Sequence, residues 1–140
     1  MFYTFSGHPA SCAIADKVLE IMEREQLVAR AEKMGALLRD RLTALESHPN
    51  VGQVRGKGLM LGIELVRDRA TMEPFPAVAR FAQKVSGAGL RNGVFFYTAG
   101  SGPVSDTILL GPPFIINGED IDLLVGALEA SINEAAAAVG

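Results

Sequence analysis

The stretch VGQVRGKGLMLGIELV, residues 51–66, decides the fold. Its second half places apolar side chains at every other position: Leu59, Leu61, Ile63 and Leu65. Because successive side chains of a strand point to opposite faces, this alternation predicts a strand with one apolar face over 59–66. A shorter strand is expected over 51–55, and Gly56-Lys57-Gly58 between the two is typical of a tight turn. The stretch therefore predicts an antiparallel hairpin.

Two helices are expected before the hairpin. Pro9 suits the first turn of a helix, Ser6 is a candidate cap, and apolar residues recur at helical spacing as far as about Glu25. A second, amphipathic helix is expected over 27–45, with apolar positions at Leu27, Ala31, Met34, Leu38, Leu42 and Leu45. The breaker residues at 47–50 should end it.

One more helix and two short strands are expected after the hairpin. The helix should run over 77–88 and stop at Gly89, and its buried side should consist of Val78, Phe81, Ala82 and Val85. The strands are expected over 93–97 and 107–110. The small turn-forming residues between them predict a mobile loop over 98–105.

A last helix completes the chain. Asn117 should cap it, with Glu119 and Asp120 in the first turn, and its apolar stripe is Ile121, Leu124, Val125, Leu128 and Ile132. Residues 135–140 should fray. The order of elements predicts an α+β fold: a small, mostly antiparallel sheet with helices packed on one side, preceded by two long helices. Residues 1–140 should form one domain.

Composition excludes several classes of function. The net charge is −3 and both signs are well mixed, so nothing indicates nucleic acid as a partner. No apolar run approaches the roughly 18 residues of a membrane span, and the first residues lack the features of a secretory signal. The single cysteine permits no internal disulfide, which favours a cytoplasmic location. Since 49% of the residues are hydrophobic, the domain has either a large core or an apolar surface for a partner.

The start of the chain, YTFSGHPASCA at residues 3–13, is the strongest candidate site. The N-terminus of a helix offers unpaired N–H groups and a partial positive charge, both of which favour an anion. Thr4, together with the backbone around Tyr3, is therefore a candidate phosphate-binding group. The alternative is a threonine that only caps the helix.

Other residues invite structural interpretations. Arg55 lies between apolar neighbours of a strand, where it should pair with Glu64 as an anchor or contact a substrate. Cys12 should be a buried structural thiol. His8 and His48 have no metal-ligand partner at helical spacing, so no zinc site is expected. No set of residues resembles a complete catalytic arrangement, and we predict no catalytic residue in this chain.

Three motifs together resemble one enzyme family. YTFSGHP followed by ASCA at 3–13, VRGKGLMLGIEL at 54–65 and LGPPFII at 110–116 are similar, in this order, to segments of class III aminotransferases. These are pyridoxal-phosphate enzymes of fold type I that include the omega-transaminases. The resemblance covers essentially the whole chain, and it implies that residues 1–140 are the C-terminal small domain of such an enzyme.

The resemblance also implies roles for single residues. The threonine that matches Thr4 binds the phosphate of the partner subunit's pyridoxal 5'-phosphate, and the residue that matches Tyr3 adds a backbone N–H. Relatives place a carboxylate-binding arginine shortly before the Pro-Pro segment, but residues 98–107 contain no arginine or lysine. Asp106 and Arg55 are then the candidate substrate-binding residues. The Schiff-base lysine should lie before Thr4, and none of Lys17, Lys33, Lys57 and Lys84 matches it.

The implied function is amino transfer between an amine or amino acid and a keto acid or aldehyde. Without the Schiff-base lysine this chain alone should be inactive and should not bind the cofactor by itself. The alternatives are a non-catalytic binding or oligomerisation module, or a class III relative with another reaction, an aminomutase or a decarboxylase. The family forms dimers, so a homo-oligomer is expected. Leucine and isoleucine side chains of the first two helices should stay partly exposed in the isolated chain.

Overall fold

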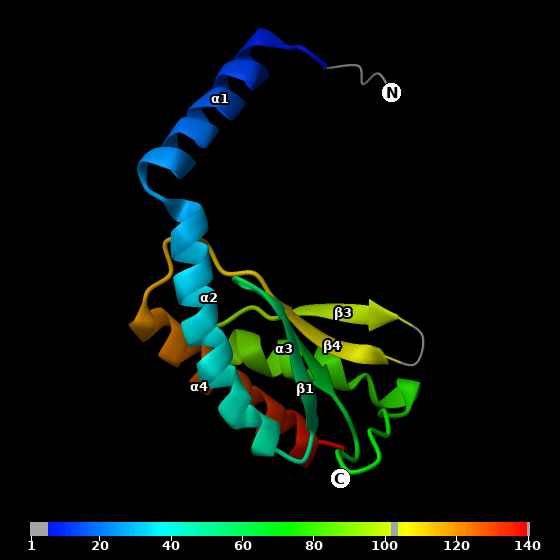
Figure 1. Ribbon diagram of the computed structural model, residues 1–140. Helices are drawn as coiled ribbons and strands as arrows, with labels where there is room; N and C mark the ends of the chain where they lie inside the picture. Colours follow the sequence, from blue (N-terminus) through cyan, green and yellow to red (C-terminus); the bar gives the residue numbers. More distant parts are fainter. Residues whose placement is uncertain (1–5, 102–103, 140) are drawn as a thin grey trace.

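The computed structural model of the chain describes residues 6–101 and 104–139 (Figure 1). Its elements are α1 (Pro9–Arg24), α2 (Leu27–Thr43), η1 (Ala44–Ser47), β1 (Val51–Lys57), β2 (Met60–Leu65), η2 (Ala77–Ala79), α3 (Phe81–Arg91), β3 (Tyr97–Ser101), β4 (Val104–Leu110) and α4 (Gly118–Ala137). The predicted α+β fold is confirmed: two helices precede an antiparallel sheet and two further helices.

The sheet has the order β1-β2-β4-β3, and every neighbouring pair is antiparallel. The predicted hairpin is confirmed, with Lys57 opposite Met60 at the turn. Gly56 and Gly58 both have positive φ, 137° and 55°, a conformation that side chains with a Cβ avoid. The turn therefore depends on its glycines.

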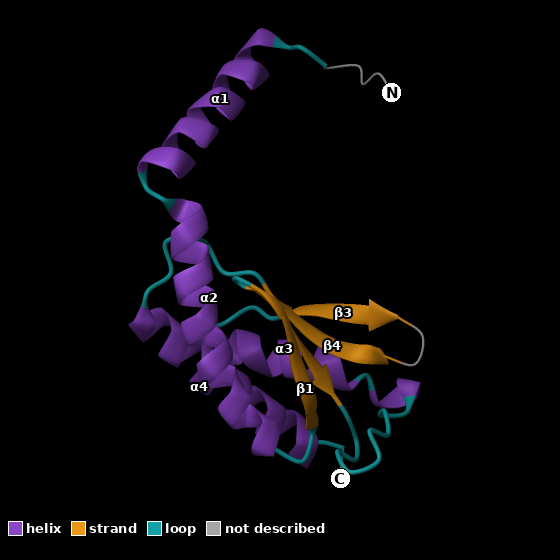
Figure 2. Ribbon diagram, in the orientation of Figure 1, coloured by secondary structure: helices purple, strands orange, loops and turns teal. Residues whose placement is uncertain are grey.

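Helices cover one face of this sheet (Figure 2). The alternating residues of β2 turn inward as predicted, since Leu61, Ile63 and Leu65 are buried. They pack with the buried stripe of α4, including Ile121, Leu128 and Ile132. The remaining positions of the strands lie on the open face of the sheet. Here Arg55 of β1 stands opposite Gly62 of β2, and Glu64 stands opposite Thr107 of β4.

Helix α2 crosses close to the hairpin turn. A Cβ added at Gly35 would lie 2.3 Å from the backbone carbon and oxygen of Gly58, so only glycine permits this approach. One turn further along α2, the guanidinium of Arg39 donates a hydrogen bond to the carbonyl oxygen of Gly56. These contacts hold the turn in place from the side of the helix.

Helix α1 extends away from the rest of the chain (Figure 1), and none of its residues is buried. Ile14 and Leu19 are 66% and 64% exposed, which confirms that aliphatic side chains of the first helices stay partly exposed. The chain changes direction between α1 and α2 at Gln26, whose φ of 52° lies in the left-handed region. The apolar stripe of α1 is therefore largely uncovered within the described residues, with only Ile21 and Met22 partly buried.

Several local expectations were wrong. The third strand is Tyr97–Ser101 instead of 93–97, and β4 begins at Val104, so most of the expected loop over 98–105 is hairpin. Residues 102–103 lie outside the described part. The reason for the shift is that Phe96 is buried in the core, where its ring would touch any Cβ at Gly89. Gly89 is consequently a packing position inside α3, and the helix ends at Arg91.

The start of α3 also differs from the expectation. Arg80 adopts a left-handed conformation that separates η2 from α3, so Val78 leaves the buried side and is 88% exposed. Phe81 begins the true helix and stacks on Phe75, with ring centroids 3.9 Å apart.

The last helix begins as predicted. Asn117 caps α4 in a capping box with Asp120. The prediction that the chain frays from residue 135 was wrong at its first position, because Ala135 is buried and belongs to α4.

Candidate functional site

The predicted phosphate-binding groups, Thr4 and Tyr3, lie outside the described residues. The chain just after them is described. Gly7 has a φ of +74°, His8 is the N-cap of α1, and Pro9 is the first helical residue. The predicted cap at Ser6 was wrong, since the N-cap is His8 and makes no side-chain hydrogen bond to the helix. Among the described residues no side chain caps the first-turn N–H groups of α1, which carry the partial positive charge that attracts an anion.

Arg55 and Glu64 form the predicted pair on the open face of the sheet. The Arg55 Nη1 donates to Glu64 Oε2 at 2.5 Å, and Gln53 Nε2 donates to the same oxygen at 2.9 Å. Burial by itself would raise the pKa of the Glu64 carboxyl. The hydrogen bonds from Gln53 and Arg55 and the charge of Arg55 outweigh burial, so the pKa is lowered from its ordinary 4.5. Glu64 is thus a carboxylate at neutral pH and anchors Arg55.

Asp106 has a structural partner in place of an open channel. The residue is 6% exposed, and its Oδ1 accepts a hydrogen bond from the backbone N–H of Ala82 at 2.9 Å. This N–H belongs to the first turn of α3, where it has no acceptor within the helix, and the negative charge also suits the positive end of the helix. Asp106 therefore links β4 to α3, and a contact with substrate would require it to leave this helix.

A hollow of about 400 Å³ lies on the open face of the sheet. Its lining residues are Arg55, Gly56, Lys57, Met60, Gly62, Thr107 and Leu109. Thr107 is 6% exposed, and its Oγ1 is buried without a hydrogen-bond partner in the described structure. Leaving a buried hydroxyl without a hydrogen bond lowers the stability of a fold by roughly 1–3 kcal/mol. Most buried polar groups therefore have a partner, and Thr107 Oγ1 is an exception.

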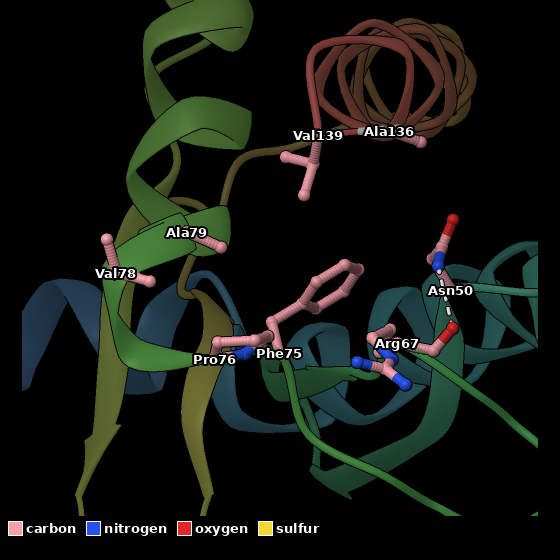
Figure 3. A pocket seen from close by; sticks show the side chains of 8 residues that line it. All are labelled: Asn50, Arg67, Phe75, Pro76, Val78, Ala79, Ala136 and Val139. Atoms are coloured by element: carbon pink, nitrogen blue, oxygen red, sulfur yellow. Dashed lines mark hydrogen bonds between the residues drawn. The ribbon is translucent and has the colours of Figure 1, made fainter.

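A larger hollow of about 530 Å³ lies elsewhere, between the end of α4, η2 and the segment after β2 (Figure 3). Its walls are mostly apolar, with Phe75, Val78 and Val139 among them. Arg67 brings a positive charge, but its Nη2 lies 3.3 Å from the carboxylate of Glu73. Of these two hollows, we consider the one on the open face of the sheet the better site, because it combines Arg55 and Lys57 with the unpartnered hydroxyl of Thr107.

The other candidate residues, His48 and Cys12, lie in a turn and on an exposed helix face. His48 accepts a hydrogen bond from the N–H of Asn50 at 3.0 Å, and its other ring nitrogen lies 3.1 Å from Asn133 Oδ1, so it organises the turn before β1. Cys12 is exposed, and the expectation of a buried thiol was wrong, because none of the described residues covers α1 at that position. Within the described residues no group of histidine, cysteine and carboxylate side chains is arranged to hold a metal ion.

Sequence reasoning missed the arginine that fixes the segment after β4. Arg30 of α2 donates to the carbonyl oxygens of Phe114, Ile115 and Ile116 at 2.8, 3.1 and 2.8 Å. No periodicity distinguishes it from the other basic residues on the polar side of α2. Thr107 was missed for a similar reason, since only the pairing of β2 with β4 brings it beside Gly62.

The family of the chain follows from its sequence as a whole. The family model "Aminotransferase class-III" matches residues 3–132, and the chain belongs to this family. In the described residues no helix is long and apolar enough to cross a membrane.

Individual relatives agree with this assignment. The chain is 42% identical to an uncharacterized aminotransferase of Schizosaccharomyces pombe, covering 99% of this chain and 31% of the relative. It is 37% identical to the adenosylmethionine-8-amino-7-oxononanoate aminotransferase of Geobacter sulfurreducens, covering 94% of this chain and 28% of the relative. The omega transaminase of Pseudomonas jessenii in complex with PMP superposes with a TM-score of 0.88 at 32% identity, covering all of this chain and 30% of that one. The chain thus spans about 30% of the length of these relatives.

Proposed function

We propose that this chain is the C-terminal small domain of a pyridoxal-phosphate-dependent class III aminotransferase, which moves an amino group between an amine or amino acid and a keto acid or aldehyde. The observation that carries the proposal is the family match over residues 3–132, which includes the candidate phosphate-binding start. The match to a transaminase structure that holds PMP supports the choice of cofactor.

The described residues fit one part of the cofactor only, its phosphate. Within the described part of the chain no side chain caps the N-terminus of α1, and an anion held by Thr4 would lie near the first-turn N–H groups of this helix. The described lysines do not form a ring-binding site: Lys17, for example, bonds to Glu20 at 2.8 Å on the surface of α1. When bound, the cofactor supplies the electron sink of the reaction. This chain would contribute the grip on the phosphate, in trans to the partner subunit, through Thr4 and the N–H at Tyr3.

We propose that Arg55 contacts the substrate and that Asp106 does not. Arg55 is about half exposed and stands beside a hollow of the open sheet face. Its pairing with Glu64 orients the guanidinium and leaves further N–H groups for a carboxylate. Asp106 is instead committed to α3.

We also propose that the uncovered side of α1 is an assembly surface, so that the working protein is a homo-oligomer. The supporting observation is that α1 has no buried residue although it carries Ile14, Val18 and Leu19. An apolar stripe of this kind is stabilised by a partner surface.

The cellular location we propose is the cytoplasm. One relative, a probable gamma-aminobutyrate transaminase of rice, is mitochondrial.

Absorbance spectroscopy of the purified chain with pyridoxal phosphate tests whether this chain lacks the lysine that binds the cofactor. We expect no specific lysine adduct, because the chain holds only the phosphate-binding part. Borohydride reduction followed by peptide mass spectrometry would reveal an adduct. Reproducible trapping on a single lysine, or amino transfer by the chain alone, would contradict the proposal and favour a self-sufficient enzyme.

A further inference from the structure

We propose that the hollow on the open face of the sheet is a binding site for a small oxyanion, a carboxylate or a phosphate. The site is made by Lys57, Arg55 and Thr107 over a floor at Gly62. The inference deepens the substrate-side role proposed above for Arg55 and rests on it there, but its test requires neither the cofactor nor any residue outside the described part of the chain.

Charge is the first observation. The rim carries Arg55 and Lys57 as cations and has Glu64 nearby as an anion, so one positive charge is left over. Glu64 already compensates Arg55 through Oε2. The side chain of Lys57 makes no ion pair or hydrogen bond in the described structure. The uncompensated charge therefore belongs to Lys57, at the hairpin turn that Gly35 and Arg39 of α2 hold in place.

The second observation is the hydroxyl of Thr107. It is buried and unpartnered, whereas buried hydroxyls in proteins nearly always have a hydrogen bond. The methyl carbon Cγ2 of the same side chain lies 3.7 Å from the point where a Cβ of Gly62 would stand, that is, over the floor of the hollow. Because side chains move between staggered rotamers, a rotation about χ1 exchanges the positions available to Oγ1 and Cγ2. An oxyanion above Gly62 would give the hydroxyl its missing acceptor.

The third observation is the floor itself. Gly62 lies in the middle of β2, where glycine weakens a strand and often marks close approach of a ligand. An added Cβ here would meet only Thr107 Cγ2 at 3.7 Å and Arg55 O at 3.8 Å, both ordinary contacts. Packing within the chain therefore does not demand glycine, in contrast to Gly35. The apolar side chains of Met60 and Leu109 flank the same floor and suit the carbon chain of an organic anion.

NMR titration of the ¹⁵N-labelled chain tests the proposal. The probes are succinate, inorganic phosphate and, as the uncharged match for succinate, succinamide. We expect saturable shifts of the amides at 55–62 and 107–109 with succinate, with phosphate or with both, and none with succinamide. Which anion saturates at lower concentration separates a carboxylate site from a phosphate site. The response should weaken as salt is added, because the site is partly exposed.

Variants connect the shifts to the named groups. Lys57→Gln and Thr107→Val should each weaken binding about fivefold, through loss of one charge or one hydrogen-bonding group. Gly62→Ala should abolish it by filling the floor while the fold is kept. Lys84→Gln removes the same charge from α3, on the opposite side of the sheet, and should bind like the unaltered chain. Circular dichroism confirms that each variant is folded.

Three results would overturn the proposal: shifts that never saturate, binding that survives Gly62→Ala, or an equal loss in Lys57→Gln and Lys84→Gln. Shifts of the same amides with protein concentration alone would also overturn it, because a second copy of the chain would then cover the face.

Discussion

The close contact between α2 and the hairpin turn gives the sharpest test of the fold. We predict that Gly35→Ala destabilises the chain, although alanine favours helices. The new Cβ would lie 2.3 Å from the carbonyl carbon and oxygen of Gly58, whereas contacts of this kind are ordinarily 3.4 Å or longer. The helix and the turn would have to separate by about 1 Å, the difference between these distances. No flexible side chain can absorb this movement, because the atoms that clash are backbone.

The magnitude follows from two opposing effects. Alanine in place of glycine inside a helix contributes about 1 kcal/mol of stability. Overpacking a buried contact costs about 1–3 kcal/mol, and more where backbone has to move, and the hydrogen bond from Arg39 to Gly56 would be lost for about 1 kcal/mol more. We therefore expect a net loss of about 1–3 kcal/mol in the free energy of unfolding.

Urea unfolding followed by far-ultraviolet circular dichroism measures this change. The matched control is Gly126→Ala in α4, where an added Cβ has nothing within 4 Å. The control should gain up to about 1 kcal/mol, since only helix propensity acts there. A Gly35→Ala chain as stable as the unaltered one, with the same dependence on urea, would refute the packing of α2 against the turn.

Three further predictions concern single side chains. Asp106→Ala should lower the free energy of unfolding by about 1–3 kcal/mol, because the Ala82 N–H loses its buried acceptor. Urea unfolding measures this loss, and an unchanged unfolding midpoint would contradict the role of Asp106 as a cap of α3. For Glu64, whose pKa is lowered in the folded chain, the stabilisation by the carboxylate is complete above the ordinary 4.5 and is lost as the pH falls through the lower folded value. Unfolding of Glu64→Gln and of the unaltered chain should therefore differ at pH 7 by about 1 kcal/mol and converge in acid, whereas a constant difference would argue against the pair. Ile14→Ser with Leu19→Ser should reduce self-association in sedimentation velocity, and a monodisperse unaltered monomer would contradict the assembly surface on α1.

The parts of the fold that were predictable are those with a local cause. The hairpin over 51–66 follows from alternation and glycine, and the start of α4 follows from the capping box of Asn117 and Asp120. The third strand was misplaced because its sequence is more apolar before Tyr97, at Val94, Phe95 and Phe96, than after it. Only the burial of Phe96 against α3 decides where the strand begins. Cys12 was misjudged because an apolar helix face says nothing about which partner covers it.

The candidate site was predictable to a smaller extent. The Arg55–Glu64 pair could be foreseen, because opposite charges on the two strands of a hairpin meet across it. The role of Asp106 at α3 depends on two segments 24 residues apart in the chain, and no spacing rule predicts it. The hollow at Gly62 and Thr107 likewise arises from the pairing of β2 with β4.

A mixed dimer tests the central claim, the phosphate grip of Thr4 in trans, most directly. One subunit of the complete aminotransferase carries Thr4→Ala, and the other carries a substitution of the cofactor-binding lysine. If Thr4 serves the partner's cofactor, one of the two sites keeps both its lysine and its threonine, so the mixed dimer should retain about half of the unaltered activity, while each single-variant dimer is impaired. Loss of activity from the mixed dimer to the level of the single-variant dimers would contradict the account.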